Sequence, residues 1–293
     1  MREHTIESAQ SVRLERISEI ELTGFGVIEK PLSTIERLMT NGLLRKTLVL
    51  MFLAGIWEVY AVWLNNPLLF PTFSATVQAF FAGLISGKII LATWSSITVL
   101  LQGYAVGLAI AALFTAFASA TQIGSDILET LTSMFNPLPS IALLPLAMIW
   151  FGLGEGSIIF VLIHAVLWAV ALNTHAGFKA VSPTWRMVGK NYGLSNIAYV
   201  TKILIPGAFP SILTGMKIGW AFAWRTLIAA ELVFGASSGS GGLGWYIFQN
   251  KNMLDIPNVF AGLLTVIIFG LLVENLIFKT VEKKTINRWG MQS

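Results

Sequence analysis

Five charged side chains stand inside long apolar segments of the chain: Glu58, Lys217, Arg225, Glu231 and Glu274. A charge at the centre of a bilayer costs about 2.5–3.5 kcal/mol on insertion scales, so such side chains face other helices or a wet cavity. Lys217 and Glu274 are near segment ends, from which they can reach an interface. Arg225 is the deepest. Its planar, permanently charged guanidinium suits either an anion in transit or an interhelical ion pair that fixes packing.

Other constellations that carry chemistry are absent from the sequence. There is no cysteine, which excludes disulfides and thiolate ligands. His164 and His175 are about 16 Å apart along one helix, too far for a common metal, so we interpret them as packing or pore-lining residues. No phosphate-binding G-x-x-x-x-G-K-[ST] motif, nucleophile–base pair or paired carboxylates occur. We therefore expect no enzyme, no metal, no cofactor and no nucleic acid bound by this chain.

The composition is typical of a membrane protein. Of the 293 residues, 55% are hydrophobic and 12% charged, whereas soluble domains carry about 25% charged residues. The short stretch 74–86 has apolar residues on one helical face, as in an interfacial helix. Six longer apolar segments are each near the ~20 residues that cross a bilayer as a helix; they are 47–64, 92–118, 127–151, 157–176, 208–234 and 258–279. We predict an all-α membrane protein with six transmembrane helices.

Lys and Arg residues predict the orientation. Seven precede Thr47, four lie in the loop 177–206 and four follow residue 278, whereas the loops on the other side hold only Lys88 and Lys251. Such an excess marks the cytoplasmic side of a bacterial inner membrane. Both termini and the 177–206 loop are thus predicted to be cytoplasmic. The Gly-rich loop 235–257, either a flexible connection or a gate element, is predicted to face outward.

The same pattern divides the chain into three parts. Residues 1–45 form a cytoplasmic tail without the apolar run of a signal peptide. Within it, residues 33–44 are either an amphipathic segment on the membrane or part of a mobile tail. The transmembrane domain covers 46–280 and includes the 177–206 loop, and 281–293 form a second cytoplasmic tail.

The third apolar segment contains Pro137, Pro139 and Pro145. Proline removes a helical hydrogen bond, and in lipid the freed groups are tolerated only against other helices or a water-filled cavity. Asn136 and Ser140 flank the first two prolines, so this break lines either a transport pathway or a packing kink.

The loop 177–206 is basic and contains the spacing Gly193, then nine residues, then Ile203-Leu204-Ile205-Pro206. This resembles the cytoplasmic signature E-A-A-x3-G-x9-I-x-L-P of binding-protein-dependent ABC importer permeases. Gly193, Ile203 and Pro206 match, Ile205 replaces the usual leucine, and Met187-Val188-Gly189 replaces E-A-A.

Further runs between about Leu69 and Trp289 resemble the taurine, aliphatic-sulfonate and nitrate branch of that family, and the 150–152 run is closest to its sulfonate and taurine members. These runs are Pro137-Leu138-Pro139-Ser140-Ile141-Ala142-Leu143-Leu144-Pro145-Leu146, Ile149-Trp150-Phe151-Gly152-Leu153-Gly154-Glu155-Gly156-Ser157, Leu213-Thr214-Gly215-Met216-Lys217-Ile218-Gly219 and Ala229-Ala230-Glu231-Leu232.

The resemblance implies the importer-permease (type I) fold and a homodimer of permease subunits. It implies ATP-binding-cassette ATPase subunits below, which bind ATP and Mg, and a periplasmic solute-binding protein above. The 182–205 loop is expected to form two short helices joined at Gly193 that dock on the ATPase, with the fifth span starting directly afterwards. The residues assigned to this coupling role are Trp185, Arg186, Met187, Val188, Gly189, Lys190, Asn191, Tyr192, Gly193, Leu194 and Pro206.

Within that set, an apolar docking face is expected from Trp185, Val188, Tyr192 and Leu194, while Arg186 and Lys190 meet acidic groups of the partner. The pathway at the dimer interface is assigned to Asn136, Pro137, Pro139, Ser140, Trp220, Trp224 and Arg225, for a small, sulfonate-like anion. The alternatives are an ATP-independent secondary transporter or channel, a membrane-embedded enzyme, and a membrane scaffold. No clear internal repeat supports the secondary transporter.

Overall fold

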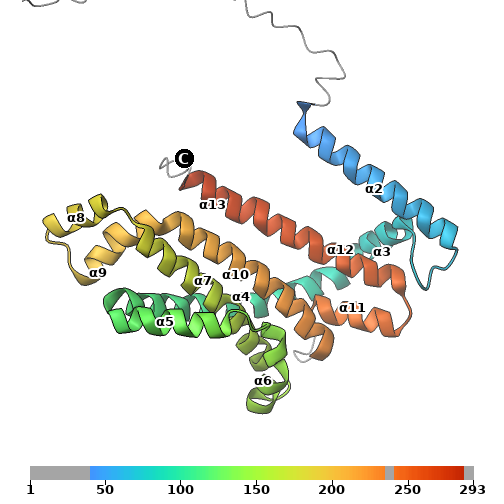
Figure 1. Ribbon diagram of the computed structural model, residues 1–293. Coiled ribbons are helices and arrows are strands. Elements are labelled where there is room, and N and C mark those ends of the chain that lie inside the picture. Colours follow the sequence, from blue (N-terminus) through green and yellow to red (C-terminus); the bar gives the residue numbers. More distant parts are fainter. Residues whose placement is uncertain (1–39, 235–240, 287–293) are drawn as a thin grey trace, which may run out of the picture. The chain divides into compact units, whose positions relative to one another are not determined.

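The computed structural model describes residues 40–234 and 241–286, and every regular element in those ranges is helical (Figure 1). The chain divides into two units, one ending at Leu53 and the other running from Ala54. The helices are α2 (Gly42–Leu64), α3 (Phe73–Ile85), α4 (Lys88–Ala120), α5 (Gln122–Phe135), the 3₁₀ helix η1 (Ser140–Leu143), α6 (Leu144–Phe151), α7 (Glu155–Ala180), α8 (Pro183–Asn191), α9 (Asn196–Tyr199), the π-helix η2 (Val200–Leu204), α10 (Ile205–Phe234), α11 (Leu243–Asn252), α12 (Ile256–Leu272), the π-helix η3 (Val273–Phe278) and α13 (Lys279–Lys284).

Five helices are long and apolar enough to cross a membrane, and they cover five of the six predicted segments. They are α2, α4, α7, the continuous run Ile197–Val233 and the continuous run Ile256–Lys284. A sixth span exists if α5 and α6 count as one broken span. The all-α fold with five to six candidate spans is therefore confirmed, and α3 is the predicted short apolar helix.

The third predicted span, 127–151, is broken at Pro137 and Pro139, as the prolines indicated. Its two arms, Gln122–Phe135 and Ser140–Phe151, are bent by 87°. Asn136 ends α5, and the chain is extended at Pro139, with φ −60° and ψ 120°. Two prolines within three residues remove two amide donors, so the helical ladder cannot continue. Pro145 lies in the first turn of α6, where a missing amide costs nothing.

The fifth span also differs from its predicted start at 208. Helical structure is continuous from Asn196 through η2 into α10, so the cytoplasmic loop and the span share one helix. In η2 the Ile205 amide reaches back five residues to the Val200 carbonyl. This π turn directly precedes Pro206, whose ring removes the next donor.

The predicted outward loop 235–257 is more ordered than a flexible connection. Residues 243–252 form α11, and α12 begins at Ile256. The part of the glycine-rich run at 235–240 lies outside the described residues, as do residues 33–39 of the predicted amphipathic segment.

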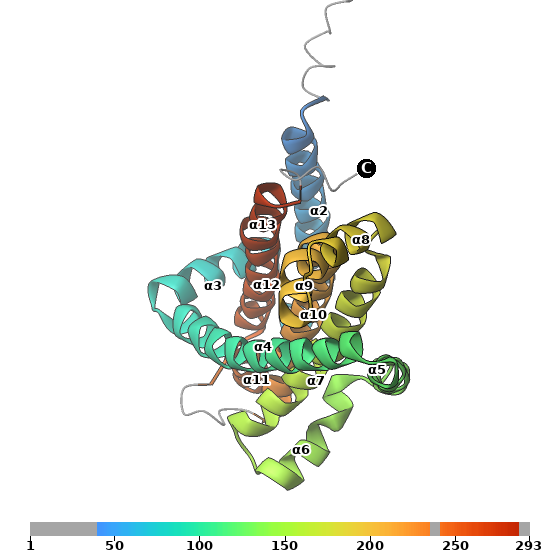
Figure 2. The same cartoon turned by 90° about the vertical axis from the view of Figure 1, so that its left-hand side faces the viewer.

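The core of the second unit forms where α7 packs along both α4 and α10 (Figures 1 and 2). Close approach depends on small residues. A Cβ on Gly103 of α4 would be 2.6 Å from Leu162 Cβ, and one on Gly107 would be 2.8 Å from Val166 Cβ. Leu162 and Val166 are fully buried.

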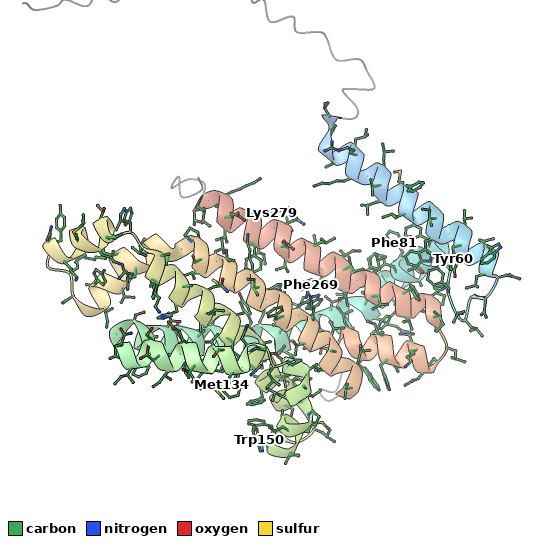
Figure 3. All side chains as sticks on the ribbon, in the orientation of Figure 1. Tyr60, Phe81, Met134, Trp150, Phe269 and Lys279 are labelled. Carbon is green, nitrogen blue, oxygen red and sulfur yellow. The ribbon has the colours of Figure 1, made fainter. Side chains whose placement is uncertain are left out.

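Apolar side chains also cover the outside of the helices. Phe81, Met134 and Trp150 are 55%, 64% and 57% exposed, and Figure 3 shows Met134 and Trp150 projecting outward. Soluble monomers rarely expose such extended apolar surface, so these positions face lipid or another subunit.

Three of the charges inside spans find partners within the second unit: Glu58, Lys217 and Glu231, whose contacts with Ser96 and Gly244 are described below. Glu58 accepts hydrogen bonds from the amide (2.9 Å) and hydroxyl (2.8 Å) of Ser74, in the first turn of α3. Lys217 of α10 forms an ion pair of 2.5 Å with Glu282 of α13, rather than extending alone to an interface as predicted. Glu274 is exposed.

Candidate functional site

The predicted helix–turn–helix around Gly193 is present. Ser182 caps α8 by accepting the Trp185 amide, and Pro183 takes the first helical position. At the other end the Leu194 amide bonds the Gly189 carbonyl and the Gly193 amide bonds the Lys190 carbonyl. With Gly193 at φ +67°, this is a Schellman motif, which favours glycine at that position.

The Met187-Val188-Gly189 departure from E-A-A has a packing explanation at its third position. Gly189 is buried where α8 crosses the helix that leads to α10. A Cβ there would be 2.9 Å from Ile203 Cγ1 and 3.0 Å from the Tyr199 ring. In this chain the bulk on the opposing helix takes the space that an alanine methyl would need.

Three of the four apolar docking candidates are exposed, two of them on α8 and the third, Tyr192, at its C-cap. Trp185, Val188 and Tyr192 are 48%, 45% and 81% exposed. Their i, i+3, i+7 spacing places them on one helical face. Leu194 differs from them. It packs against the buried cluster of Phe178, Val181, Ile203, Leu204 and Ala208, because the Schellman turn directs it inward. The remaining candidates are placed as follows: Met187, Lys190 and Asn191 are exposed on α8, and Pro206 lies in the first turn of α10.

Arg186 is used inside the chain. Its Nε donates to the Val181 carbonyl at 3.1 Å, and its Nη2 donates to the Phe178 carbonyl at 2.5 Å. A longer bond of 3.4 Å reaches the Lys179 carbonyl. These carbonyls lie at the C-terminal end of α7, where a cation is favoured. Arg186 therefore holds α8 to α7, and its contact with acidic groups of a partner stays a prediction.

The break after α5 opens onto a cavity of about 360 Å³ that gathers most of the predicted pathway residues. Asn136, Pro137, Pro139 and Ser140 line it from one side and Arg225 of α10 from another. Arg225 is exposed and has no ion-pair or hydrogen-bond partner among residues 40–234 and 241–286. Of the two roles left open by the sequence, the interhelical ion pair is therefore not found in the described chain.

Trp220 and Trp224 lie apart from that cavity. Trp224 is buried, packs against Phe269 with ring centroids 4.9 Å apart, and donates to the Val266 carbonyl at 3.3 Å. Trp220 packs edge-on to Tyr104, 5.3 Å between centroids. Both line a separate cavity of about 310 Å³, which Arg225 also borders. Their positions are those of packing residues between α10, α4 and α12.

Two histidine contacts were not predicted from the sequence. His164 of α7 lines the 360 Å³ cavity, with its Nδ1 3.1 Å from the Ser140 hydroxyl. His175 lies 3.1 Å from the Ser125 hydroxyl and 3.4 Å from Glu129, which also pairs with Lys179. The histidines had been interpreted as packing or pore-lining, but no local pattern in the sequence links them to α5 or to the break that follows it.

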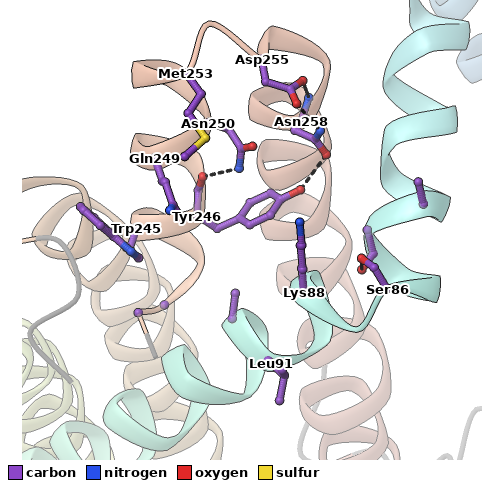
Figure 4. Close-up of a pocket in the computed structure, with 15 residues that line it drawn as sticks. Ser86, Lys88, Leu91, Trp245, Tyr246, Gln249, Asn250, Met253, Asp255 and Asn258 are labelled. Atoms are coloured by element: carbon purple, nitrogen blue, oxygen red, sulfur yellow. Dashed lines mark hydrogen bonds between the residues drawn. The ribbon is translucent and has the colours of Figure 1, made fainter. Parts of the chain in front are cut away.

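Another cavity, of about 690 Å³, lies between α3, α4, α11 and α12 (Figure 4) and contains no predicted site residue. Tyr246 of α11 donates to Asn258 Oδ1 at 2.7 Å, and Asn250 Nδ2 donates to the Tyr246 carbonyl. Burial and then the nearby Asp255 carboxylate raise the pKa of the Tyr246 phenol. Lys88 and Asp255 add one charge of each sign to the lining. Tyr246 and Asn250 on this wall belong to α11, a helix that lies within the loop 235–257 predicted from the sequence.

Comparison with known proteins identifies the family. Residues 103–285 match the family described as the binding-protein-dependent transport system inner membrane component. A putative ABC transporter permease protein of Methanocaldococcus jannaschii is 29% identical over 223 residues, which is 75% of this chain and 82% of the relative. The taurine transport system permease protein of Escherichia coli is 35% identical over 148 residues (50% and 52%), and the nitrate import permease protein of Synechocystis is 32% identical over 152 residues (52% and 54%). Since the match covers more than half of its length, the chain belongs to the inner membrane components of binding-protein-dependent transport systems and is a multi-pass importer permease.

Proposed function

We propose that this permease is driven by separate ATP-binding-cassette ATPase subunits that bind ATP and Mg and dock on α8. A second copy of the chain completes the pathway, and a periplasmic solute-binding protein delivers the solute. Both termini and the 182–205 loop then face the cytoplasm of a bacterial cell. The docking residues in this proposal are the exposed ones on α8, and Gly189, Gly193, Leu194 and Pro206 hold the shape of the loop.

The observation that carries the docking proposal is the apolar face of Trp185, Val188 and Tyr192. It stands on a short helix that carries Lys190 and is fastened to α7 through Arg186. An exposed aromatic pair on a rigid, basic helix is the composition of an interface anchor rather than of a topology signal alone. α8 packs at Gly189 against Tyr199 and Ile203 of the helical run that continues from Asn196 into α10, and this contact gives a mechanical path from α8 to the span.

The docking test is a Tyr192→Glu substitution, assayed by co-purification of the ATPase encoded beside this chain. Loss of an interface anchor weakens association by at least about tenfold, while membrane insertion is unchanged. Met253→Glu, at an equally accessible apolar residue after α11, is the matched control and retains the ATPase. Full co-purification with Tyr192→Glu contradicts the docking face. Uptake that continues with an ATPase-dead partner supports a secondary transporter instead.

For the solute, we propose a small anion of the sulfonate or taurine type. The relatives named above include permeases for taurine and nitrate, and a putative aliphatic sulfonates transport permease protein of Escherichia coli is 25% identical over 228 residues. The cavity bordered by Asn136, Ser140 and Arg225 offers one unpaired guanidinium among neutral hydrogen-bonding groups. Such a site favours an oxyanion, because a guanidinium donates two parallel hydrogen bonds to it.

The solute assignment is tested in proteoliposomes that contain the permease, the ATPase and the binding protein. Arg225→Gln lowers uptake of radiolabelled taurine or nitrate by about tenfold or more, the cost of a charged hydrogen bond. ATP hydrolysis continues. Lys251→Gln removes an exposed positive charge on α11 and is the control. Equal uptake by Arg225→Gln and the control removes Arg225 from the pathway.

A further inference from the structure

Glu231, near the end of α10, binds the N-terminus of α11. The Gly244 amide donates to its Oε2 at 2.8 Å, and the Ser96 hydroxyl of α4 lies 2.7 and 2.8 Å from its two oxygens. The Leu243 amide donates in turn to the Ser96 oxygen at 2.8 Å. The first two amides of α11 therefore end on Glu231, one directly and one through a hydroxyl. A carboxylate is favoured there by the helix dipole as well as by the free amides.

This contact is buried and fitted closely. Glu231 is 4% exposed, and Ser96 and Leu243 are fully buried. A Cβ on Gly242 would be 2.0 Å from Glu231 Oε1, and one on Gly244 would be 2.6 Å from the Ile228 carbonyl oxygen. Glycines at both positions let the backbone of α11 reach the carboxylate. No cation lies within ion-pair distance of Glu231 in the described part of the chain, so the amides and the hydroxyl are its compensation.

α10 reaches from the loop around α8 to this contact. Its 30 residues extend about 45 Å at 1.5 Å per residue. The helix joins η2 at one end and carries Glu231 in its last turn at the other. A displacement of the helical run that starts at Asn196, directly after the turn at Gly193, is therefore transmitted to the Glu231 end without a further loop.

α11 in turn forms one wall of the cavity of about 690 Å³. Figure 4 shows Trp245, Tyr246, Gln249 and Asn250 of α11 facing that space, and the Tyr246 hydroxyl bonds Asn258 of α12. A shift of α11 changes the shape of this cavity and pulls on α12 through the Tyr246–Asn258 bond.

We propose that Glu231 is a positioning residue that makes α11 move with the far end of α10, so that ATP-driven motion of α10 reaches the wall of the 690 Å³ cavity. The inference depends on the proposed ATPase docking at α8. Glu58 holds α3 by the same kind of contact, with Ser74 as the donor, but its helix α2 does not join the 182–205 loop. It is therefore the matched control.

The test uses the assembled permease–ATPase complex in proteoliposomes. Because the chain has no cysteine, Gln249→Cys on α11 gives a single thiol, whose labelling rate with a membrane-impermeant maleimide is measured with and without ATP–vanadate. We expect the two labelling rates to differ by about fivefold or more, because coupling between two sites of a protein typically changes the affinity at one of them by at least about fivefold. Glu231→Ala abolishes that difference while ATP hydrolysis continues, and Glu231→Gln, which keeps one acceptor oxygen, restores part of it. Glu58→Ala leaves it intact.

Two results overturn the inference: a labelling difference that survives Glu231→Ala, or no difference in the parent although ATP is hydrolysed. If Glu231→Ala fails to assemble, Ser96→Ala is used, since it keeps the carboxylate and removes the Leu243 relay; a reduced difference supports the inference and an unchanged one rejects it. Failure of the ATPase to associate with the parent refutes instead the proposed function on which the inference depends.

Discussion

Replacing Arg186 by methionine tests whether α8 is fastened to α7 by this side chain. Methionine keeps the apolar stem and removes the guanidinium. The substitution deletes two well-placed hydrogen bonds, 3.1 Å to the Val181 carbonyl and 2.5 Å to the Phe178 carbonyl. The third bond, to the Lys179 carbonyl, is weak at 3.4 Å and adds little. It also removes a cation from the C-terminal end of α7.

The magnitude follows from these contacts. A hydrogen bond to a charged donor contributes about 1.5–3 kcal/mol when buried, and a cation at a helix C-terminus about 0.3–1 kcal/mol. Arg186 is half-buried, so solvent competes for the guanidinium and we expect a total of about 2 kcal/mol rather than the full sum. Because each 1.4 kcal/mol is tenfold, detachment of α8 becomes about 30-fold more frequent.

Amide hydrogen exchange of the 183–191 peptide measures that frequency, because exchange of protected amides follows the population of the open state. The chain is studied alone in nanodiscs, so that no docked ATPase contributes protection. Lys190→Met is the control: it lies four residues along the same helix, removes the same charge, and its side chain forms no ion pair or hydrogen bond within residues 40–234 and 241–286. Equal exchange in the two variants would show that Arg186 does not hold α8. Contact with acidic groups of a partner would then be its remaining predicted role.

Three further outcomes follow from the packing and the charges. Gly103→Leu forces atoms into Leu162, whose Cβ would be 2.6 Å from the added Cβ, and lowers thermal stability by at least about 1–3 kcal/mol; unchanged stability contradicts the close α4–α7 contact. The Lys217–Glu282 pair shows a coupling of about 1 kcal/mol in a double-mutant cycle of unfolding, and a zero coupling removes it from the α10–α13 packing. The raised pKa of Tyr246 means that the folded state binds the phenolic proton more tightly than the unfolded state does. The protonated phenol therefore contributes fully to the free energy of unfolding below the ordinary tyrosine pKa, and this contribution is lost as pH rises through and above that pKa. Ultraviolet titration of the protein and of its Tyr246→Phe variant measures that shift, and a tyrosine titrating at its ordinary pKa contradicts it.

The loop 182–205 was the most predictable part of the site. Its capping serine, the proline at the first helical position and the glycine at the turn are local signals that lie within the sequence they describe. The direction of Leu194 and the use of Arg186 were not predictable, because both depend on α7 packing beneath the loop. A basic residue on an exposed helix looks the same in sequence whether it meets a partner or a neighbouring carbonyl.

In the membrane spans, too, local features were predictable from the sequence and features that depend on packing were not. Apolar length predicted α4 and α7 well, and the prolines at 137 and 139 marked the break in the third segment. The angle of that break could not be predicted, since it depends on where α6 packs. The π turn before Pro206 was also missed, because hydropathy shows no difference between one long helix and two that meet at a loop.

Two of the three carboxylates inside predicted spans lead to a rule that sequence reading could have used. Glu58 and Glu231 each bind a first-turn amide of a short helix, and the donor residues, Ser74 and Gly244, lie 16 and 13 residues later in the chain. A helix N-terminus offers free amides and a partial positive charge without requiring a cation, which would itself be costly in the membrane. A lone acidic residue near the end of a span, followed closely by a small residue at a helix start, therefore predicts a cap as readily as an ion pair. Arg225 has no comparable contact. A guanidinium would be compensated by the free carbonyls of a helix C-terminus, and Arg225 bonds none in the described chain. A cation that the fold leaves without a partner is more naturally explained by a ligand or a second subunit than by packing.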